Sequence, residues 1–518
     1  MTTLKYGRPV LGLAAAAILM FAMGSHVGAQ SGTPQSPGPS LPISMAQAVA
    51  MALDANLDLR AEKLNLDVAS HSIAIAKASF LPLVQATTSN GSAKSVPSDF
   101  TQGTQDITSN SIALTGSVRQ ETPWYGSSYF LTWTGRRSTQ DGGFSGFNPR
   151  LGSTLRLDFT QPLLRDFKTD NLRAGVETSE RRRVISDIQL QQRVVATEAA
   201  VRFAYLNLVG AIEGHKVAQI NLDIVQQSLD QSRSRVKVGQ SPQIEIIQYE
   251  AQVASTRDGL IRAVAQIATA EDNLRTLILD PARPDFWQIH IVPTDTIQLV
   301  PREINLEQAI TTAIANRLDL AAEQRSLEIT DLNIRVSHNN SLPSVDLNAS
   351  YQSEGTGGTQ LSYGAGFPPP VLSESRRSYG SALGDTLLGA YPSWSVGVTV
   401  SYPFGRTANE AAHAQSLVLK RQQEIGLKQL EVTIVGQVRE AVRLIDNSWQ
   451  RVQAAQTARE ATQQQLTAEE RRNSVGLSTT LELQVRQREL ANARVNELQA
   501  MIDYNRALIQ LERVQRIQ

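Results

Sequence analysis

The sequence contains an internal repeat, and this repeat constrains the fold more than any other feature. Residues 43–84 align without a gap with residues 304–345, at an offset of 261, and 14 of the 42 pairs are identical. A second match lies later in each half, where Val238-Gly239-Gln240-Ser241 aligns with Val475-Gly476-Leu477-Ser478 at an offset of 237. Two matches in the same order indicate a duplicated unit, and such units commonly pack with pseudo-symmetry. A pseudo-symmetric unit of this kind suits the building of a ring or tube.

The N-terminus has the pattern of a secretory signal. Two basic residues come first, an apolar run follows over residues 10–23, and small residues occupy positions 27–29. We expect a signal peptide over residues 1–29 rather than a membrane anchor, because the apolar run of 14 residues is shorter than the roughly 20 that a spanning helix needs. Residues 30–42, rich in Ser, Gly and Pro, are expected to form a flexible leader.

The composition argues against several classes of function. The chain has no cysteine, which excludes disulfides, thiolate chemistry and a lipid-modified N-terminal cysteine. Lys and Arg number 49, as do Asp and Glu, so no basic face for nucleic acid is indicated. The six histidines form no His-x-x-x-His pair, and no glycine-rich loop follows a strand and opens a helix. We therefore expect no enzymatic activity, no cofactor, no metal and no nucleic-acid partner.

Each half repeats one order of elements: a helix, a zone of strands, a long helix, a turn and a return helix. Residues 44–79 carry apolar side chains at helical spacing, with Ser44 placed to cap the helix. The longest helices are expected over about 168–236 and about 406–473, which contain no proline. At 1.5 Å per residue each would be about 100 Å long, so each must pack against neighbours in a coiled coil.

The return helices are expected over about 242–279 and about 480–516, roughly half the length of their long partners. The helices at 44–79 and 305–341 have the length needed to stack end to end with them. The first repeat is then residues 43–280 and the second is residues 304–518. An irregular linker over 281–303 joins the two, with a short strand near residues 288–292.

The strand zones are expected over residues 81–162 and 343–403. Leu155 to Thr160 alternates strictly between apolar and polar side chains, which is typical of a strand with two different environments. The first zone is about 20 residues longer than the second, and an extra hairpin around residues 122–126 would account for the difference. We expect four to six strands, with a Gly/Ser/Pro-rich loop over residues 353–391.

Such strands cannot cross a bilayer alone, because only helices and closed barrels satisfy every backbone group in lipid. One chain has too few strands for a barrel, since outer-membrane barrels begin at eight, so several chains would have to pool them. Aromatic residues concentrate in and beside the strand zones, as they do at the rims of membrane barrels. The alternative is that strands are generally rich in aromatic residues.

The chain resembles the TolC-like outer-membrane efflux proteins of Gram-negative bacteria over residues 43–516. The resemblance rests on the duplication, on the paired helix openings from Gln47 to Leu59 and from Gln308 to Leu320, and on the two Val-Gly turns. It implies a mainly α fold with a small β part: a duplicated coiled-coil α-barrel of long helices plus a trimeric outer-membrane β-barrel. It also implies a periplasmic adaptor and an inner-membrane transporter as partners.

In that family the Val-Gly turns lie at the periplasmic tip and contact the adaptor. The resemblance transfers this role to two turns, 238–242 and 475–479. The residues are Val238, Gly239, Gln240 and Ser241, and Val475, Gly476, Leu477 and Ser478. The second turn matches the family pattern fully, whereas Gln240 departs from it. The alternative is structural: both glycines could end helices in the left-handed conformation, with Ser241 as a cap and Pro242 at the first helical position.

Two acidic residues follow the turns. Glu482 matches a position at which some family members place an acid in the closed mouth, where three copies would form a cation-attracting ring. The alternative is a capping box with Thr479. Glu245 is the equivalent residue of the first repeat, and the same two interpretations apply to it.

Two functions follow. The first is a passive outer-membrane trimeric channel, the exit duct of a tripartite efflux or type I secretion system. The second is a soluble periplasmic coiled-coil scaffold or adaptor. The sequence does not identify the exported substrate.

Overall fold

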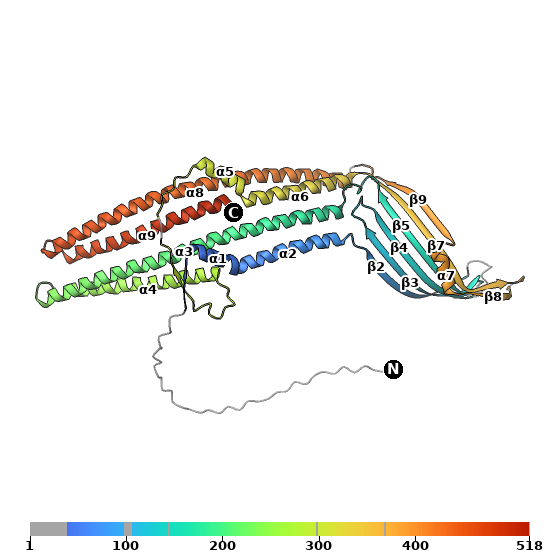
Figure 1. The fold of residues 1–518 in the computed structure, drawn as a ribbon, viewed down its shortest axis with the longest axis horizontal. Helices are drawn as coiled ribbons and strands as arrows, with labels where there is room; N and C mark the ends of the chain where they lie inside the picture. The colour runs from blue at the N-terminus through green and yellow to red at the C-terminus, as the bar shows by residue number, and fades with distance from the viewer. Residues whose placement is uncertain are drawn as a thin grey trace, which may run out of the picture.

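The protein is long and narrow, with a bundle of helices at one end and a twisted sheet at the other (Figure 1). The computed structural model describes residues 39–97, 106–142, 144–296, 299–366, 369–405 and 407–516. The expected signal peptide and most of the leader lie outside the described residues. The end of the leader is not irregular, because β1 (Ser40–Ile43) pairs in parallel with β6 (His290–Pro293) in the linker.

The long helices and their return helices form two hairpins of equal design. Both long helices have 67 residues, and the offset between them is the one that relates the two turns. The first hairpin is α3 (Asn171–Lys237) with α4 (Ile244–Ile278), and the second is α8 (Ala408–Ser474) with α9 (Thr480–Arg516).

The shorter helices are each broken once, contrary to the expectation of one continuous helix. They are α1 (Met45–Ala55) and α2 (Leu57–Ala78), and α5 (Leu306–Asn316) and α6 (Leu318–Ser341). Ser44 caps α1 in a reciprocal capping box, as predicted.

The breaks lie where these helices meet the ends of the return helices. At the first break, Asn56 Nδ2 donates to the carbonyl of Leu277 in α4 (3.2 Å). At the second, Arg317 Nη1 donates to the carbonyl of Val514 in α9 (3.0 Å). These residue pairs are equivalent in the repeat. The duplication therefore includes the joints, by which we mean the places where a broken helix meets the end of a return helix. Each return helix therefore continues into a shorter helix as a stacked rod, as the predicted lengths indicated.

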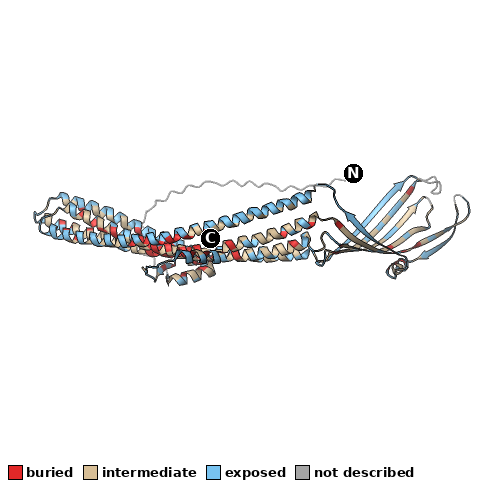
Figure 2. Cartoon of the chain, turned by 90° about the horizontal axis from the view of Figure 1, so that it is seen from above, coloured by how far each residue is buried: buried red, intermediate tan, exposed pale blue. Residues whose placement is uncertain are grey.

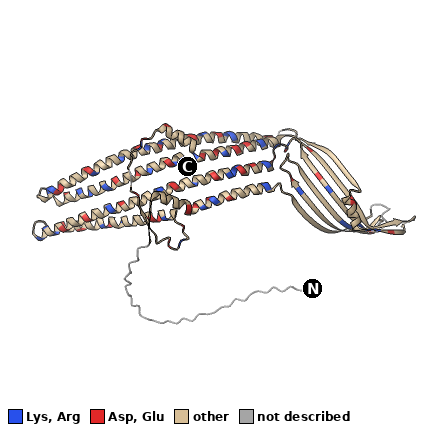
Figure 3. Cartoon of the chain, in the orientation of Figure 1, with Lys and Arg blue, Asp and Glu red and all other residues tan. Residues whose placement is uncertain are grey.

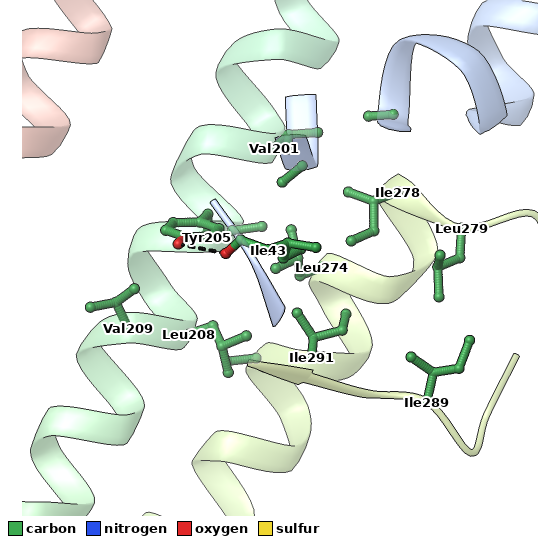
Figure 4. Close-up of a cluster of buried hydrophobic side chains, with 14 of the residues drawn as sticks. Ile43, Val201, Tyr205, Leu208, Val209, Leu274, Ile278, Leu279, Ile289 and Ile291 are labelled. Atoms are coloured by element: carbon green, nitrogen blue, oxygen red, sulfur yellow. Dashed lines mark hydrogen bonds between the residues drawn. The ribbon is translucent and has the colours of Figure 1, made fainter. Parts of the chain in front are cut away.

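The cores of the two halves lie midway along the helices, where buried residues are concentrated in Figure 2. In the first half, α1, α3, α4 and the β1–β6 pair enclose an apolar cluster (Figure 4). Tyr205 of α3 is 1% exposed, and its hydroxyl donates to the carbonyl of Ile43 (3.0 Å). This bond joins the end of β1 to the long helix.

A second cluster joins α5, α8 and α9 in the other half. Tyr504 of α9 is fully buried there, and its hydroxyl donates to the carbonyl of Val300 (2.7 Å). The amide of Asp295 donates to the hydroxyl of Tyr205 at 3.2 Å, so the linker is fixed to both cores. One stretch of α3 is apolar and long enough to cross a membrane, and the same helix contributes buried residues between 201 and 209 to the first core.

The sheet follows the antiparallel order β2-β3-β4-β5-β7, and both β8 and β9 pair with β7. β9 pairs with the first half of β7 and β8 with its far end, so β8 and β9 share one edge. The strands are β2 (Leu83–Ser95), β3 (Ile107–Glu121), β4 (Ser128–Asp141), β5 (Phe147–Pro162), β7 (Ser344–Tyr363), β8 (Val371–Arg377) and β9 (Pro392–Ser401).

The sheet confirms the predicted hairpin and corrects the predicted loop. Residues 122–127 join β3 to β4, as expected from the longer first zone. Residues 353–391, expected as a loop, instead contain the end of β7, all of β8 and a short helix, α7 (Tyr379–Leu387). Glycine and serine there serve close packing of α7 on the strands, which composition alone does not separate from a loop. In the described part of the chain this sheet has seven strands, one more than the upper limit of the prediction, because β8 and β9 share one edge of β7.

Candidate functional site

The two Val-Gly turns lie side by side at the end of the bundle farthest from the sheet (Figure 1). Gly239 and Gly476 both have φ of +77°. The amide of Gln240 donates to the carbonyl of Arg235 (2.9 Å), and the amide of Leu477 donates to that of Arg472 (2.9 Å). These six-to-one bonds are the mark of a Schellman motif, which places glycine in the left-handed conformation. The glycines therefore end both long helices in the left-handed conformation, which is the structural role expected of them whether or not a partner binds the turns.

The helix starts after the turns differ from the expected caps. Ser241 does not cap α4, because the helix begins three residues later, at Ile244, behind Gln243 and without a side-chain cap. Pro242 consequently lies in the turn rather than at the first helical position. In the second turn, the Thr479 hydroxyl accepts from the amide of Glu482 (3.3 Å), which forms one half of the expected capping box.

Several apolar side chains are exposed at the tip. Val238, Val475 and Leu477 are each more than two thirds exposed, and Ile247 and Leu481 beside them are each 60% exposed. Single exposed apolar residues are ordinary, but a contiguous exposed group marks an interaction site. The turns therefore combine a rigid backbone with side chains suited to a protein contact.

Behind the tip, the two hairpins meet through buried polar side chains. Arg235 Nη1 donates to Asn473 Oδ1 (3.0 Å), and Gln487 Nε2 donates to Ser228 Oγ (3.1 Å). Asn473 and Gln487 are buried, as are Ser232 and Gln484 beside them. We call this group the polar seam; it comprises Ser228, Ser232, Arg235, Asn473, Gln484 and Gln487.

The polar seam is incompletely satisfied. Ser232 Oγ, Gln484 Nε2 and Gln487 Oε1 are buried, and within the described part of the chain they have no hydrogen-bond partner. Each such atom costs about 1–3 kcal/mol of desolvation. An interface of this kind holds the hairpins together less firmly than an apolar one, so it is suited to separation.

Glu245 and Glu482 lie in the first turns of α4 and α9, directly after the tip. Burial raises the pKa of Tyr249 to about 12, and the nearby carboxylate of Glu245 adds to the increase. Tyr249 therefore stays neutral throughout the physiological range. Glu482 is exposed and Glu245 is partly exposed, so both carboxylates are accessible in a single copy.

The sequence patterns locate the two turns and the two acidic residues but do not indicate the polar seam. Its members are ordinary polar residues in helices that are polar throughout, and no motif singles them out. Their only sequence signal is position, because they occupy inward-facing places where coiled coils normally carry apolar side chains.

The sheet has two chemically different faces. The concave face has a hollow of about 810 Å³ lined by hydroxyl, amide and charged side chains, among them Arg136 and Arg150. The convex face carries the apolar positions of the alternating strands, including Trp133, Leu155 and Leu157. Few charges mark the sheet compared with the helices (Figure 3). This arrangement suits a wall between water and lipid.

Both lateral edges of the molecule are unpartnered. Every residue of β2 and of β9, the strands at the two edges, is exposed. The helices that continue these edges, α2 and α8, carry exposed apolar stripes with spacings of mostly seven residues. The stripe on α2 comprises Leu57, Leu64, Val68 and Ile75, and the stripe on α8 comprises Val418, Ile425 and Val432.

The family model described as "Outer membrane efflux protein" matches residues 131–278 and 309–514. The outer membrane efflux protein BepC of Brucella suis is 23% identical over 393 residues, which are 73% of this chain and 75% of that protein. The outer membrane protein TolC of Escherichia coli is 25% identical over 328 residues, 61% of this chain and 62% of that protein.

The fold is also similar to that of solved structures. The CmeC outer membrane channel of Campylobacter jejuni superposes with a TM-score of 0.65 at 14% sequence identity. The superposition covers 91% of this chain and 85% of that one. At this low sequence identity, the similarity establishes the fold alone, which includes the helical bundle and the sheet.

Proposed function

The chain belongs to the outer membrane efflux protein family, and we propose that three copies of it close into one continuous tube. As a member of that family it is an exit duct of efflux systems in the outer membrane. The proposal concerns how the duct is assembled, where its partner docks and what keeps it closed. It rests on one observation above all, which is that both edges of a single copy are open.

The two edges are complementary. β2 runs away from the bundle and β9 runs toward it, so β9 of one copy would pair antiparallel with β2 of the next. The stripes on α2 and α8 both lie in the helical half nearest the sheet, where they would meet as a coiled-coil seam. A head-to-tail contact of this kind produces a ring when its rotation closes. Three copies, as the family resemblance implies, would form it.

Closure of the ring would pair the backbone groups that are free at the two edges of the sheet. An exposed strand edge leaves N–H and C=O groups unpaired, which lipid does not tolerate. In the closed ring each edge is paired, the convex apolar face meets lipid and the concave polar face surrounds water. The helices then extend the duct into the periplasm, and transport through it is passive.

We place the adaptor of the efflux system at the apolar tip. The two turns end both hairpins farthest from the membrane, where a periplasmic adaptor joined to an inner-membrane transporter would reach them. Replacing Gly476 with tryptophan should weaken adaptor binding by about tenfold, because a bulky residue at the φ of +77° costs about 1–3 kcal/mol of backbone strain and would change the shape of the turn. The measurement is adaptor affinity together with export of an efflux substrate.

The matched control is Gly476→Asn, since asparagine tolerates a positive φ better than other residues with a side chain. It should retain most of the affinity. Both variants should still insert in the outer membrane. Intact export with Gly476→Trp would remove the docking role from this turn.

We further propose that the polar seam is the gate, whose opening separates the two hairpins. Replacing Arg235 with alanine removes a hydrogen bond to a charged group, worth about 1.5–3 kcal/mol. The open fraction of the purified channel should then rise about tenfold to a hundredfold. Single-channel conductance in a planar bilayer measures it.

Arg233 provides the control, because its ion pair with Glu250 (2.8 Å) stays within one hairpin. Arg233→Ala should leave the conductance unchanged. Equal conductance of the two variants would place the gate elsewhere.

Glu245 and Glu482 would line the mouth of the channel beside the polar seam, where three copies of each carboxylate would favour cations.

The competing function, a soluble periplasmic scaffold, predicts a different location after fractionation. An inserted duct stays with outer membranes through a high-salt wash, because apolar contact with lipid is not screened by salt. Release of the intact protein by that wash would contradict the assembly proposed here.

A further inference from the structure

Two arginines lie together on the concave face of the sheet. Arg136 of β4 is paired with Gly152 of β5, and Ser138 of β4 is paired with Arg150 of β5. The two arginines are therefore diagonal neighbours on adjacent strands, a separation of about 7–8 Å that long side chains can bridge. Both also line the hollow of about 810 Å³. Strand register and cavity thus place the two side chains beside one another.

Arg136 and Arg150 are exposed, and neither takes part in an ion pair within the part of the chain that the structure describes. The space over them is open as well. A Cβ atom added at Gly152, directly opposite Arg136, would meet no other atom within 4 Å. The two positive charges are therefore accessible to a solute in the hollow.

The other groups that line the hollow are suited to bind oxyanions. Its lining includes the hydroxyl groups of Ser109, Ser111, Thr134, Ser138 and Thr356. Each hydroxyl can donate one hydrogen bond, and each guanidinium can hold a carboxylate by two. In the described lining the one carboxylate is that of Glu354, which accepts from Gln352 Nε2 (2.6 Å). The hollow therefore has more positive than negative charge.

The arginines of the concave face that lie nearer the bundle differ, because each has an acid beside it. Arg156 Nη2 donates to Asp158 Oδ1 (2.8 Å), and Arg119 Nη2 donates to Glu121 Oε1 (3.1 Å). Arg156 is four residues from Gly152 on β5, so it shares the concave face. Arginine without an acidic partner thus marks a different level of the same face.

That level is the half of the sheet far from the bundle. β5 begins at the far end and runs toward the bundle, where it leads into α3, and Arg150 lies near the start of β5. In the proposed duct the far end of the sheet is the outer mouth. An exported solute would therefore pass Arg136 and Arg150 shortly before it leaves the duct.

We infer that Arg136 and Arg150 of the three copies form a band that binds oxyanion groups of exported solutes, carboxylates above all, just inside the outer mouth. The inference rests on the proposed duct and names the class of solute that its outer half favours. Rings of Arg or Lys are a usual means of anion selection in pores. The acids at the tip lie at the opposite end, so a solute with both a cationic and an anionic group is attracted at each end in turn.

The test is the block of single-channel current by citrate, a small tricarboxylate. The protein is added to one chamber of a planar bilayer cell. Its polar bundle stays in that chamber, so the outer mouth opens to the opposite one. Citrate added to the opposite chamber should reduce the current of the unaltered channel. The block should be stronger in about 10 mM than in about 1 M salt, because the Debye length falls from about 30 Å to about 3 Å.

Arg136→Gln and Arg150→Gln should each raise the citrate concentration needed for half block about fivefold, which is the effect of losing one charge contact in water. Arg137→Gln is the matched control, because it removes the same charge from the next residue of β4 but on the convex face. It should leave the block unchanged. Arg136→Lys keeps the charge and should retain most of the block.

Equal effects of Arg136→Gln and Arg137→Gln would overturn the inference, as would a current that citrate at the outer mouth does not reduce. Either result in a conducting trimer leaves the proposed duct intact. Light scattering, measured in parallel, separates this failure from a failure of assembly, since a protein that forms no trimer would overturn the duct and the band together.

Discussion

Replacing Val432 with aspartate is expected to leave the single chain folded and to abolish the trimer. Val432 is 72% exposed in one copy, so its substitution disturbs no internal packing. In the proposed ring it faces α2 of the next copy, at the height of Leu57. An unpaired carboxylate placed in an apolar seam costs several kcal/mol, and the trimer has three such seams. Light scattering of the detergent-extracted protein should show monomers.

Thr433→Asp is the control for this substitution. Thr433 is also exposed, but it points about a quarter turn away from Val432 around α8. It introduces the same charge one residue away and should leave the trimer intact. Ile425→Asp, one heptad earlier in the stripe, should reproduce the effect of Val432→Asp. A stable trimer in both stripe variants would show that α8 does not form the contact between copies.

Replacing Arg317 with leucine is expected to destabilise the second repeat by about 3–5 kcal/mol, the usual cost of breaking a buried ion pair. The Arg317 side chain is 1% exposed, and Nε donates to one oxygen of Asp319 at 2.8 Å while Nη2 donates to the other at 2.5 Å. Its remaining bonds join α6 to Gln437 of α8 and to Val514 of α9. Chemical unfolding followed by circular dichroism measures the loss.

Two companion variants identify the cause of that loss. The double variant Arg317→Leu with Asp319→Leu should recover most of the stability, because it removes both charges rather than stranding one. Arg60→Leu at the equivalent joint of the first repeat should have little effect, since its pair with Asp280 is largely exposed. If the double variant is no more stable than the single one, the carboxylate of Asp319 is not the source of the loss.

The repeat allowed much of the bundle to be predicted from sequence. Long runs without proline set the two long helices, and the matching Val-Gly pairs located both turns, because these signals act within a few residues. The breaks at Asn56 and Arg317 were not predicted. They depend on contact with the ends of α4 and α9, which lie about 200 residues away in the chain.

Two features of the structure were also beyond the reach of sequence patterns. The polar seam consists of side chains such as Asn473 and Gln487, whose burial arises only when two hairpins meet. The helix α7 has the composition of a loop, and its packing depends on the space left where Gly135 and Gly355 have no side chain. In both cases the decisive contacts are long-range, and local propensity does not contain them.

The measurement that tests the proposed duct most directly is the mass and shape of the detergent-extracted protein, by light scattering combined with negative-stain imaging. The proposed tube predicts a particle with three times the mass of the mature chain. In end view it should have a central pore, and in side view it should be well over 100 Å long, since α3 and α8 alone each span about 100 Å. A monomer or dimer whose mass does not depend on detergent would contradict the closed tube.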